Sequence, residues 1–489
     1  MKIKSIKLNA LLNVVYTITN MIFPLITYPY VTRVLSATGM GTVSFFTSVS
    51  NYAVMVGSLG ISTYGIRAVA KVRDNEKDLS KITTELFILN TIITVIVIAV
   101  LAVSVPFVKQ FNTEPALLLI NLLIVIATPF GLDWLYSGLE QYAYITKRTI
   151  LFKTISLIMV FLLVRRKSDY PIYAAITAFS TIGAYFCNFV YSRNFVHFHS
   201  LNGLNYRRHF KPMILLFSSI LAVSVYTNLD TIMLGFINDN YQVGLYSVAS
   251  KVKWLLLSAV NAVSAVLLPR LSNYISNGET DKYYAALKKS VSFIFIVTIP
   301  LSVFFTLEAA DSIYFLGGPD YGEAILCMQF LMPILVISGL SNVIGNQVLI
   351  PQGHDSQFMI AVVVGAVVDI ILNAVLMPGL ACTGAAIATL AAEFTQMSIQ
   401  LHFARKDILK NIHKSTLWKS ILAAVIAGFA IVSLRRFINF LSIVNLMITA
   451  VVFFGTYALV LIALREEYMI EIMQRGFFKM KSSIGAGHR

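Results

Sequence analysis

The sequence has few charged residues for its length. Of 489 residues, 12% are Asp, Glu, Lys or Arg, whereas 57% are hydrophobic. A soluble protein carries about 25% charged residues. So few charges cannot cover a water-soluble surface of this size, and lipid must replace water over most of it. The shortage of charge therefore predicts an integral membrane protein rather than a soluble enzyme.

Cysteine and catalytic motifs are also scarce. Cys187, Cys327 and Cys382 lie in apolar segments without a CxxC spacing or a nearby histidine, which predicts small buried side chains. The chain has no Walker A phosphate loop and no nucleophile–base arrangement, so we expect no ATP hydrolysis, catalytic residue, metal or cofactor. No polar stretch is long enough to form an appended domain.

Long hydrophobic runs are abundant instead. Each has about the 20 residues that cross a hydrocarbon core, so they predict an all-α polytopic membrane protein of about fourteen helices. The first run continues past Pro24 and Pro29, too long for a signal peptide core. The segments are 9–31, 40–66, 82–106, 116–138, 148–164, 171–192, 212–236, 241–267, 284–306, 323–347, 357–378, 380–403, 416–438 and 440–464.

The net charge of +15 would suit a nucleic-acid partner in a soluble domain. In a membrane protein, Lys and Arg instead collect in cytoplasmic loops and set the orientation, so we expect no nucleic acid. With the N-terminus inside, roughly 28 basic residues fall inside and roughly 7 outside. The outer loop 307–322 has none. The residues that oppose the bias are Arg165, Arg166, Lys167, Arg435 and Arg436. Both termini are therefore predicted to be cytoplasmic.

An internal repeat organises these helices. Gly41 to Val49 and Gly244 to Val252 share the pattern G-x-x-S-x-x-[ST]-x-V, at an offset of 203 residues (244 − 41). The same offset carries Arg67 onto Arg270. Six helices per copy give both copies the same orientation, as in transporters with parallel repeats. The predicted domains are a first lobe at 1–205, a second lobe at 206–410, and two further helices with a cytoplasmic tail at 411–489. Two such lobes suit alternating access around a central cleft.

Ionisable residues within the spans are costly and therefore candidates for function. Lys251 lies about 15 Å into its helix, near the midplane, where it could bind the phosphates of an anionic lipid. Its alternative role is a structural pair with Asp230. Lys253 projects about 200° away from Lys251 and is a weaker candidate.

Two carboxylates lie at similar depth on neighbouring helices, each within a polar stripe. Asp369 is followed by Asn373 at i+4, and Glu393 is followed by Gln396 and Gln400. A buried carboxylate could carry a coupling proton or sodium ion. The alternative is a polar clasp between the two helices.

Amide side chains mark the first two segments. Asn13 and Asn20 belong to a polar stripe on the first helix, and Asn51 to one on the second. Such faces should meet protein or a wet cavity, where they suit a sugar or a hydrated headgroup. Ordinary helix–helix contacts are at least as good an account of any single one.

Several segments resemble bacterial polysaccharide repeat-unit flippases of the Wzx type. The first runs from Pro24 through Arg33 to Gly41, and the second from Ser58 through Arg67 to Lys71. In the second lobe, the similar segments are Asp230 to Gly235, Gly244 to Lys251, Asn373 to Pro378 and Gly384 to Thr389. These segments span twelve helices and agree in order and spacing with the family and with its superfamily of multidrug and oligosaccharidyl-lipid exporters.

The resemblance implies two six-helix lobes with two added helices. It implies a flippase, not an enzyme, which moves undecaprenyl-diphosphate-linked oligosaccharides to the outer leaflet of the bacterial cytoplasmic membrane. The pathway would be O-antigen, capsule or exopolysaccharide assembly, coupled to H⁺ or Na⁺. Membrane lipid and the pathway's polymerase and assembly proteins are candidate partners. The motif-matched residues are Arg33, Arg67, Asp230 and Lys251.

Two other functions are alternatives for a membrane protein of this composition. A cation-coupled multidrug exporter would share the fold, but basic cavity residues favour an anionic substrate. A membrane glycosyltransferase or polymerase would need a catalytic constellation, commonly on a large outer loop, and loop 307–322 leaves little room for one.

Overall fold

The computed structural model of the chain describes residues 6–197, 204–411, 413–437 and 440–470. Within these ranges the chain forms helices and turns and no β-strand. Ten helices there are long and apolar enough to cross a membrane. Two of them, Leu12–Val72 and Asp355–Phe403, each hold two predicted segments, and α7 and α9 coincide with the remaining two. The predicted all-α polytopic fold is therefore confirmed.

The chain divides into two compact units, Met1–Gly244 and Leu245–Arg489. α9 packs on α1 and α2 in the first unit, whereas the sequence repeat assigns it to the second lobe. The lobe ranges 1–205, 206–410 and 411–489 therefore stay a prediction, and residues 471–489 of the tail lie outside the described chain.

The first unit contains α1 (Ile6–Ser58), α2 (Ile61–Val72), α3 (Glu76–Ser104), η1 (Val105–Phe107), α4 (Lys109–Thr113), α5 (Pro115–Ala127), η2 (Thr128–Gly131), α6 (Asp133–Gly138), α7 (Tyr142–Leu163), η3 (Lys167–Asp169), α8 (Tyr170–Ser192) and α9 (Arg207–Ile237).

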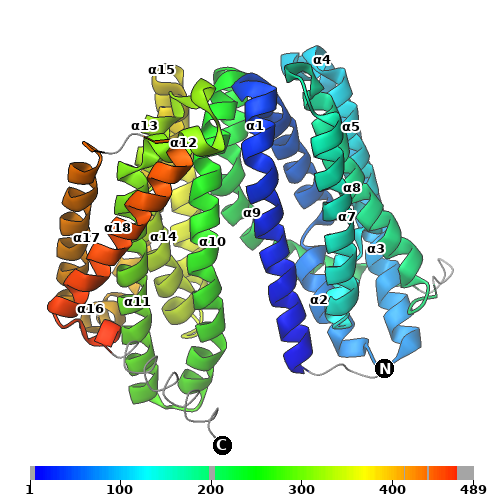
Figure 1. Cartoon of the computed structure of the whole chain (residues 1–489). Coiled ribbons are helices and arrows are strands. Elements are labelled where there is room, and N and C mark those ends of the chain that lie inside the picture. The colour runs from blue at the N-terminus through cyan, green and yellow to red at the C-terminus, as the bar shows by residue number, and fades with distance from the viewer. Residues whose placement is uncertain (1–5, 198–203, 412, 438–439, 471–489) are drawn as a thin grey trace, which may run out of the picture. The chain divides into compact units, whose positions relative to one another are not determined.

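Local sequence sets where these helices bend and begin. α1 contains two prolines and then breaks at Ser36, where φ is 63° and ψ is 173°, so it holds two predicted spans in one assigned helix (Figure 1). α3 begins at Asn75, whose side chain accepts hydrogen bonds from the backbone N–H groups of Lys77 and Asp78. Such a cap satisfies N–H groups that lack a partner in the first turn.

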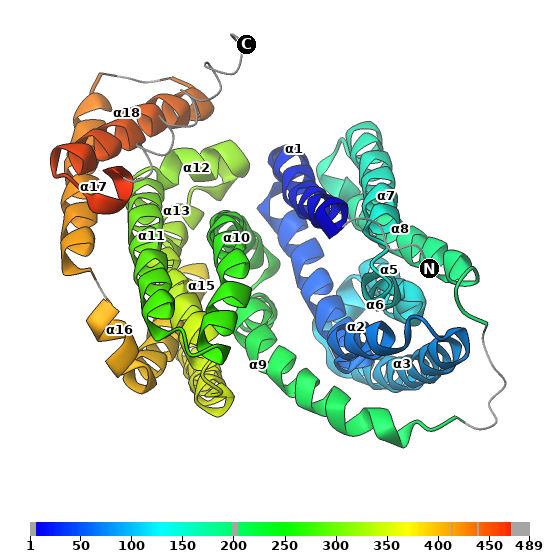
Figure 2. The same cartoon turned by 90° about the horizontal axis from the view of Figure 1, so that it is seen from below.

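Small residues allow close packing in the first unit. The ring of Trp134 on α6 lies directly over Gly65 on α2, where a Cβ would come within 2.6 Å of it. Trp134 belongs to a buried apolar cluster with Leu86 and Leu135. Seen end-on in Figure 2, α2, α3, α5 and α6 gather in one group. This packing fixes the irregular segment between α5 and α6.

α10 (Asn240–Ser276) begins at the end of the first unit and continues into the second. In Figure 2, α17 and α18 lie side by side within the second unit. The helices that follow α10 are α11 (Thr280–Leu307), α12 (Ala309–Leu316), η4 (Pro319–Tyr321), α13 (Ala324–Leu331), α14 (Ile334–Asn342), the π-helical turn η5 (Val343–Leu349), α15 (Asp355–Phe403), α16 (Arg405–Asn411), α17 (Lys414–Leu434) and α18 (Ser442–Ala463).

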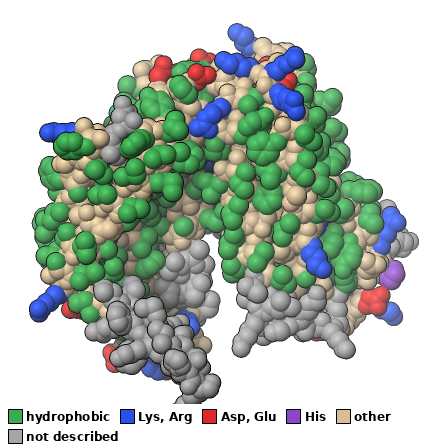
Figure 3. Space-filling view, viewed as in Figure 1, with side chains coloured by type: hydrophobic (Ala, Val, Ile, Leu, Met, Phe, Trp, Pro, Cys, Tyr) green, Lys and Arg blue, Asp and Glu red, His purple; other side chains and the backbone are tan. Residues whose placement is uncertain are grey.

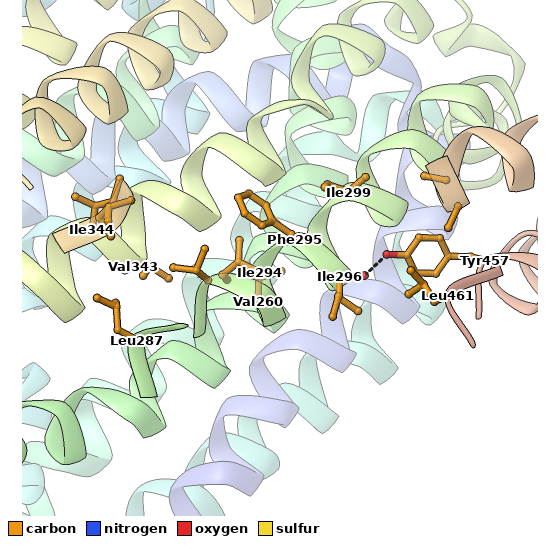
Figure 4. Packing of buried hydrophobic residues seen from close by; sticks show 14 of the residues in the cluster. Val260, Leu287, Ile294, Phe295, Ile296, Ile299, Val343, Ile344, Tyr457 and Leu461 are labelled. Atoms are coloured by element: carbon orange, nitrogen blue, oxygen red, sulfur yellow. Dashed lines mark hydrogen bonds between the residues drawn. The ribbon is translucent and has the colours of Figure 1, made fainter. Parts of the chain in front are cut away.

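The core of the second unit joins α11 to its neighbours. Ile294 and Phe295 of α11 pack with Val343 of η5, and the hydroxyl of Tyr457 on α18 donates a hydrogen bond to the Ile296 carbonyl at 3.0 Å (Figure 4). The two added helices are thus attached by both apolar and polar contacts.

Charge is distributed as a membrane protein requires. In Figure 3, hydrophobic side chains cover the visible flank of the helices, and charged side chains gather towards their ends. Large apolar residues such as Val100 on α3, Leu215 on α9 and Phe429 on α17 are exposed. Lipid tails can cover such surfaces, which water cannot do without cost.

Candidate functional site

The two halves of α15 carry the predicted carboxylates of the second unit. Ala381 leaves helical geometry, with φ of 46° and ψ of −126°, and splits α15 into two halves. The halves pack closely through glycines: a Cβ on Gly365 would lie 3.1 Å from that of Gln396, and one on Gly384 would lie 2.6 Å from the Leu376 carbonyl oxygen. α15 thus provides two adjacent polar helical faces.

Asp369, Asn373 and Thr389 are completely buried on these halves. Asp369 and Asn373 fall between the two glycine contacts, and therefore lie near the depth of Thr389. The hydroxyl of Thr389 lies 3.2 Å from that of Tyr246 on α10. A carboxyl, an amide and two hydroxyls are thus held in a dry interior, where an ionised carboxylate needs a proton or a cation to compensate its charge.

The stripe that begins at Glu393 faces α14. Ser341 donates a hydrogen bond to Gln400 at 2.7 Å and lies 3.2 Å from the amide nitrogen of Gln396. Glu393, one turn earlier, is 8% exposed and lies close to Ser338 and to the charge of Lys253. The predicted stripe is therefore buried in the protein, and its carboxylate is near a lysine.

Lys251 and Lys253 are both partly exposed on α10. The ammonium of Lys251 lies 5.1 Å from the ring centroid of Trp254, a cation–π geometry that leaves the charge on a partly exposed face. The predicted pairing of Lys251 with Asp230, which belongs to the first unit, stays a prediction.

The other candidate residues lie on the first unit. Asp230 on α9 is 1% exposed, whereas Arg33 and Arg67 are exposed. Arg33 donates a hydrogen bond to the Pro29 carbonyl at 2.6 Å, which holds the guanidinium against a turn that lacks a proline N–H.

The three amides on α1 differ in burial. Asn13 and Asn51 are exposed, and Asn20 is half-buried. No contact tests the predicted roles of these residues.

The first unit also holds a cluster that the sequence analysis missed as a unit, in which the buried side chains of Arg148 and Asn188 contact the partly exposed Asp133. Arg148 on α7 is 8% exposed; it donates to Asp133 at 2.9 Å and to the side chain of Asn188 on α8. Asn188 also donates to Asp133 and to the carbonyl of Gly131. The available signal was the sequence Thr128-Pro-Phe-Gly131 inside an apolar run, since interrupted spans mark transporter sites.

Comparison with known proteins places these features in a family. The profile of the family described as "Polysaccharide biosynthesis protein" matches residues 6–275, which is more than half of the chain. The chain belongs to this family. A second profile, "MatE", matches residues 215–375 of the chain.

Relatives of the chain include the "Putative O-antigen transporter" of Escherichia coli (strain K12). The two are 24% identical over 409 residues, which cover 82% of this chain and 98% of the relative. The chain is a multi-pass membrane protein of a family whose members include such transporters.

Two solved structures share the fold of this family member. "Lipid II flippase MurJ, inward closed conformation" superposes with a TM-score of 0.73 at 15% identity, covering 94% of this chain and 99% of that one. An inward-facing multidrug resistance MATE family transporter of the MOP superfamily gives a TM-score of 0.63 at 13% identity, covering 80% and 94%.

A second ionic cluster lies where α17 meets α12. Arg435, at the end of α17, pairs with Glu308 at 2.8 Å and with Asp311 on α12. The sequence signal was an arginine that the predicted orientation places outside, against the charge bias. In the structure two carboxylates compensate its charge.

Proposed function

We propose that this transporter flips undecaprenyl-diphosphate-linked oligosaccharide repeat units from the cytoplasmic to the outer leaflet of the bacterial cytoplasmic membrane. The step would serve O-antigen, capsule or exopolysaccharide biosynthesis. The observation that carries the proposal is the similarity to the Escherichia coli relative over 98% of that protein's length. Movement by alternating access of the two repeats follows from the internal symmetry.

Lys251 is the proposed ligand of the lipid diphosphate. Its ammonium is partly exposed on a membrane-spanning helix, beside Trp254. A cation inside a membrane is retained where it meets an anion, and a diphosphate supplies one. Lys253 lies near Glu393 and would contribute less. Arg33 and Arg67, both exposed, would meet the headgroup near the interfaces.

Asp230, Asp369 and Glu393 are the proposed carriers of the coupling ion, H⁺ or Na⁺. All three are buried, and Asp369 is fully removed from solvent on the same helix as Asn373. Exchange of a proton or a sodium ion at such a carboxylate would change the charge of the unit that holds it during each cycle.

The test is leaflet accessibility of the labelled lipid-linked glycan in proteoliposomes under an imposed H⁺ or Na⁺ gradient. We expect gradient-dependent transfer, which Lys251→Ala reduces at least tenfold without reducing membrane insertion. Lys282→Ala removes a lysine that is exposed and paired with Glu279, and should transfer normally. If the wild-type protein leaves the glycan in one leaflet, the proposal is wrong. If the wild-type protein transfers the glycan and Lys251→Ala transfers it equally well, Lys251 is not in the site.

A further inference from the structure

A cavity of about 330 Å³ lies inside the first unit, apart from the residues assigned above to diphosphate and ion. Its walls come from the end of α1, the start of α2, α3, the segment from η2 to α6, and α8. Ligand pockets span about 300–1,000 Å³, so this one can hold a short segment of a glycan but not a long repeat unit.

Irregular backbone forms part of the wall. The fourth span breaks between η2 and α6, where Leu132 has φ of 33°, and the turn between α1 and α2 has φ of 38° at Leu59 and 76° at Gly60. A left-handed conformation strains a leucine, because its Cβ comes too close to the following carbonyl oxygen. Non-helical backbone inside a membrane persists only where it is buried in protein or lines a wet cavity, and broken spans mark the binding sites of transporters.

The chemistry of the lining is that of a sugar site. Trp134 and Tyr185 supply aromatic surface, which packs against the C–H faces of pyranose rings. Asn51, Asn90 and Ser62 add amide and hydroxyl groups, which can both donate and accept hydrogen bonds. Aromatic walls with a few polar groups are typical of pockets that orient a small ligand.

The charge of the lining argues against the other candidate ligands. Asp133 is the one acidic residue among the lining residues, and no Lys or Arg is among them. A diphosphate would therefore meet a carboxylate and no cation. A cationic drug would gain little either, because Arg148 already compensates the charge of Asp133 at 2.9 Å.

The site also has unused hydrogen-bonding capacity. Arg148 and Asn188 both donate to the Oδ1 atom of Asp133, and among the described residues none donates to Oδ2, although the side chain is 48% exposed. The second carboxylate oxygen of Asp133 is thus available to accept a hydrogen bond from a polyol.

We propose that this cavity is a subsite for uncharged sugar residues of the transported glycan, with Asn51, Asp133, Trp134 and Tyr185 as its ligands. The inference rests on the proposed flippase function, because it assigns the sugar part and the diphosphate part of that function's substrate to two different sites. The basic residues, Lys251 first, would bind the diphosphate, and the cavity would bind sugar.

Separate binding measurements with the glycan part and with the diphosphate part of the substrate test whether the two parts bind at different places. The full-length protein in detergent is titrated calorimetrically with the oligosaccharide released by mild acid from the polyprenyl-diphosphate lipids of the same cells, and separately with pyrophosphate. We expect Asn51→Ala to weaken oligosaccharide binding about fivefold, and Ser62→Trp, which fills the cavity from an exposed position, to weaken it at least tenfold. Both should leave pyrophosphate binding unchanged, and Lys251→Ala should give the opposite pattern.

Asn277→Ala is the matched control, because Asn277 is an exposed amide of the second unit. The proposal is overturned if the wild-type protein does not bind the oligosaccharide, if Asn51→Ala and Ser62→Trp bind it normally, or if they weaken pyrophosphate equally. The leaflet assay separates the two proposals. Sugar binding without transfer would refute flipping alone, whereas transfer with an unchanged half-saturating concentration in Ser62→Trp would refute the subsite alone.

Discussion

Asn188 connects three parts of the first unit that are far apart in sequence. Its side chain accepts from Arg148 on α7 and donates to Asp133 and to the Gly131 carbonyl, and its own carbonyl accepts from the hydroxyl of Tyr136. Asn188 is fully buried. Because Arg148 and the Gly131 carbonyl lie in the buried part of this cluster, where water cannot easily replace a lost partner, the amide should contribute strongly to stability.

Asn188→Ala should therefore lower the thermal unfolding midpoint of the detergent-purified protein. Each buried polar group that loses its partner costs about 1–3 kcal/mol, and the change removes partners from Arg148, Asp133 and Gly131 at once. Asn277→Ala removes an exposed amide and should leave the midpoint within error. An unchanged midpoint for Asn188→Ala would show that the cluster does not stabilise the unit.

For single residues, the burial of three candidate carboxylates was predictable, whereas the partners of the ionic groups were not. Depth in the apolar segments indicated Asp230, Asp369 and Glu393, and all three are buried. The partners of Arg148 were not foreseen, because they lie 15 and 40 residues away along the chain and only packing brings them together. The functional roles of these residues remain predictions.

The attachment of α17 to α12 depends on a charge cluster with an excess acid. Glu308 is completely buried at the end of α11 and shares Arg435 with Asp311. Burial raises the pKa of Glu308 above its ordinary value; the Arg435 guanidinium opposes this shift, and Asp311 adds to it. One arginine does not fully compensate two carboxylates.

Glu308→Gln should stabilise the protein at neutral pH and have little effect near pH 4. A carboxyl whose pKa is raised by folding binds more protons in the folded state, so stability falls as pH rises from the unfolded pKa, about 4.3, through the raised value. The glutamine cannot ionise and avoids this loss. Thermal unfolding midpoints of both proteins from pH 4 to pH 8 should converge at the acidic end; a parallel offset at every pH would contradict the explanation.

Helix existence was predictable from hydropathy, and helix breaks were not. The segment predicted at 116–138 is α5, η2 and α6, and the one at 323–347 is α13, α14 and the π-helical η5. Mean hydropathy over a window measures how favourably the side chains transfer to lipid, whereas a helix break such as the one at Leu132 depends on backbone torsion angles. The proline and the glycine in 128–131 indicated the break locally, but the mean hydropathy of the window does not record it.

For the whole molecule, element boundaries agree with the repeat. α11 begins 204 residues after α3 (280 − 76) and ends 203 residues after it (307 − 104). The offset of 203 also carries the break at Ser36 in α1 onto Asp239, between α9 and α10. Two copies with the same orientation would place equivalent loops on the same side of the membrane. Chemical labelling at a few loop positions can therefore determine the orientation of the chain.

Orientation stays a prediction from the excess of basic residues on one side. Arg435 falls on the opposite side in that prediction, where it pairs with Glu308 and Asp311. We expect a cysteine at Asp320, exposed in η4, to react from outside intact cells with a membrane-impermeant maleimide. A cysteine at Lys77, an exposed residue in the first turn of α3, should react only after permeabilisation. Replacing the three native cysteines provides the background, and labelling of Lys77→Cys but not Asp320→Cys in intact cells would reverse the topology and place the carboxylates of the Arg435 cluster on the cytoplasmic side.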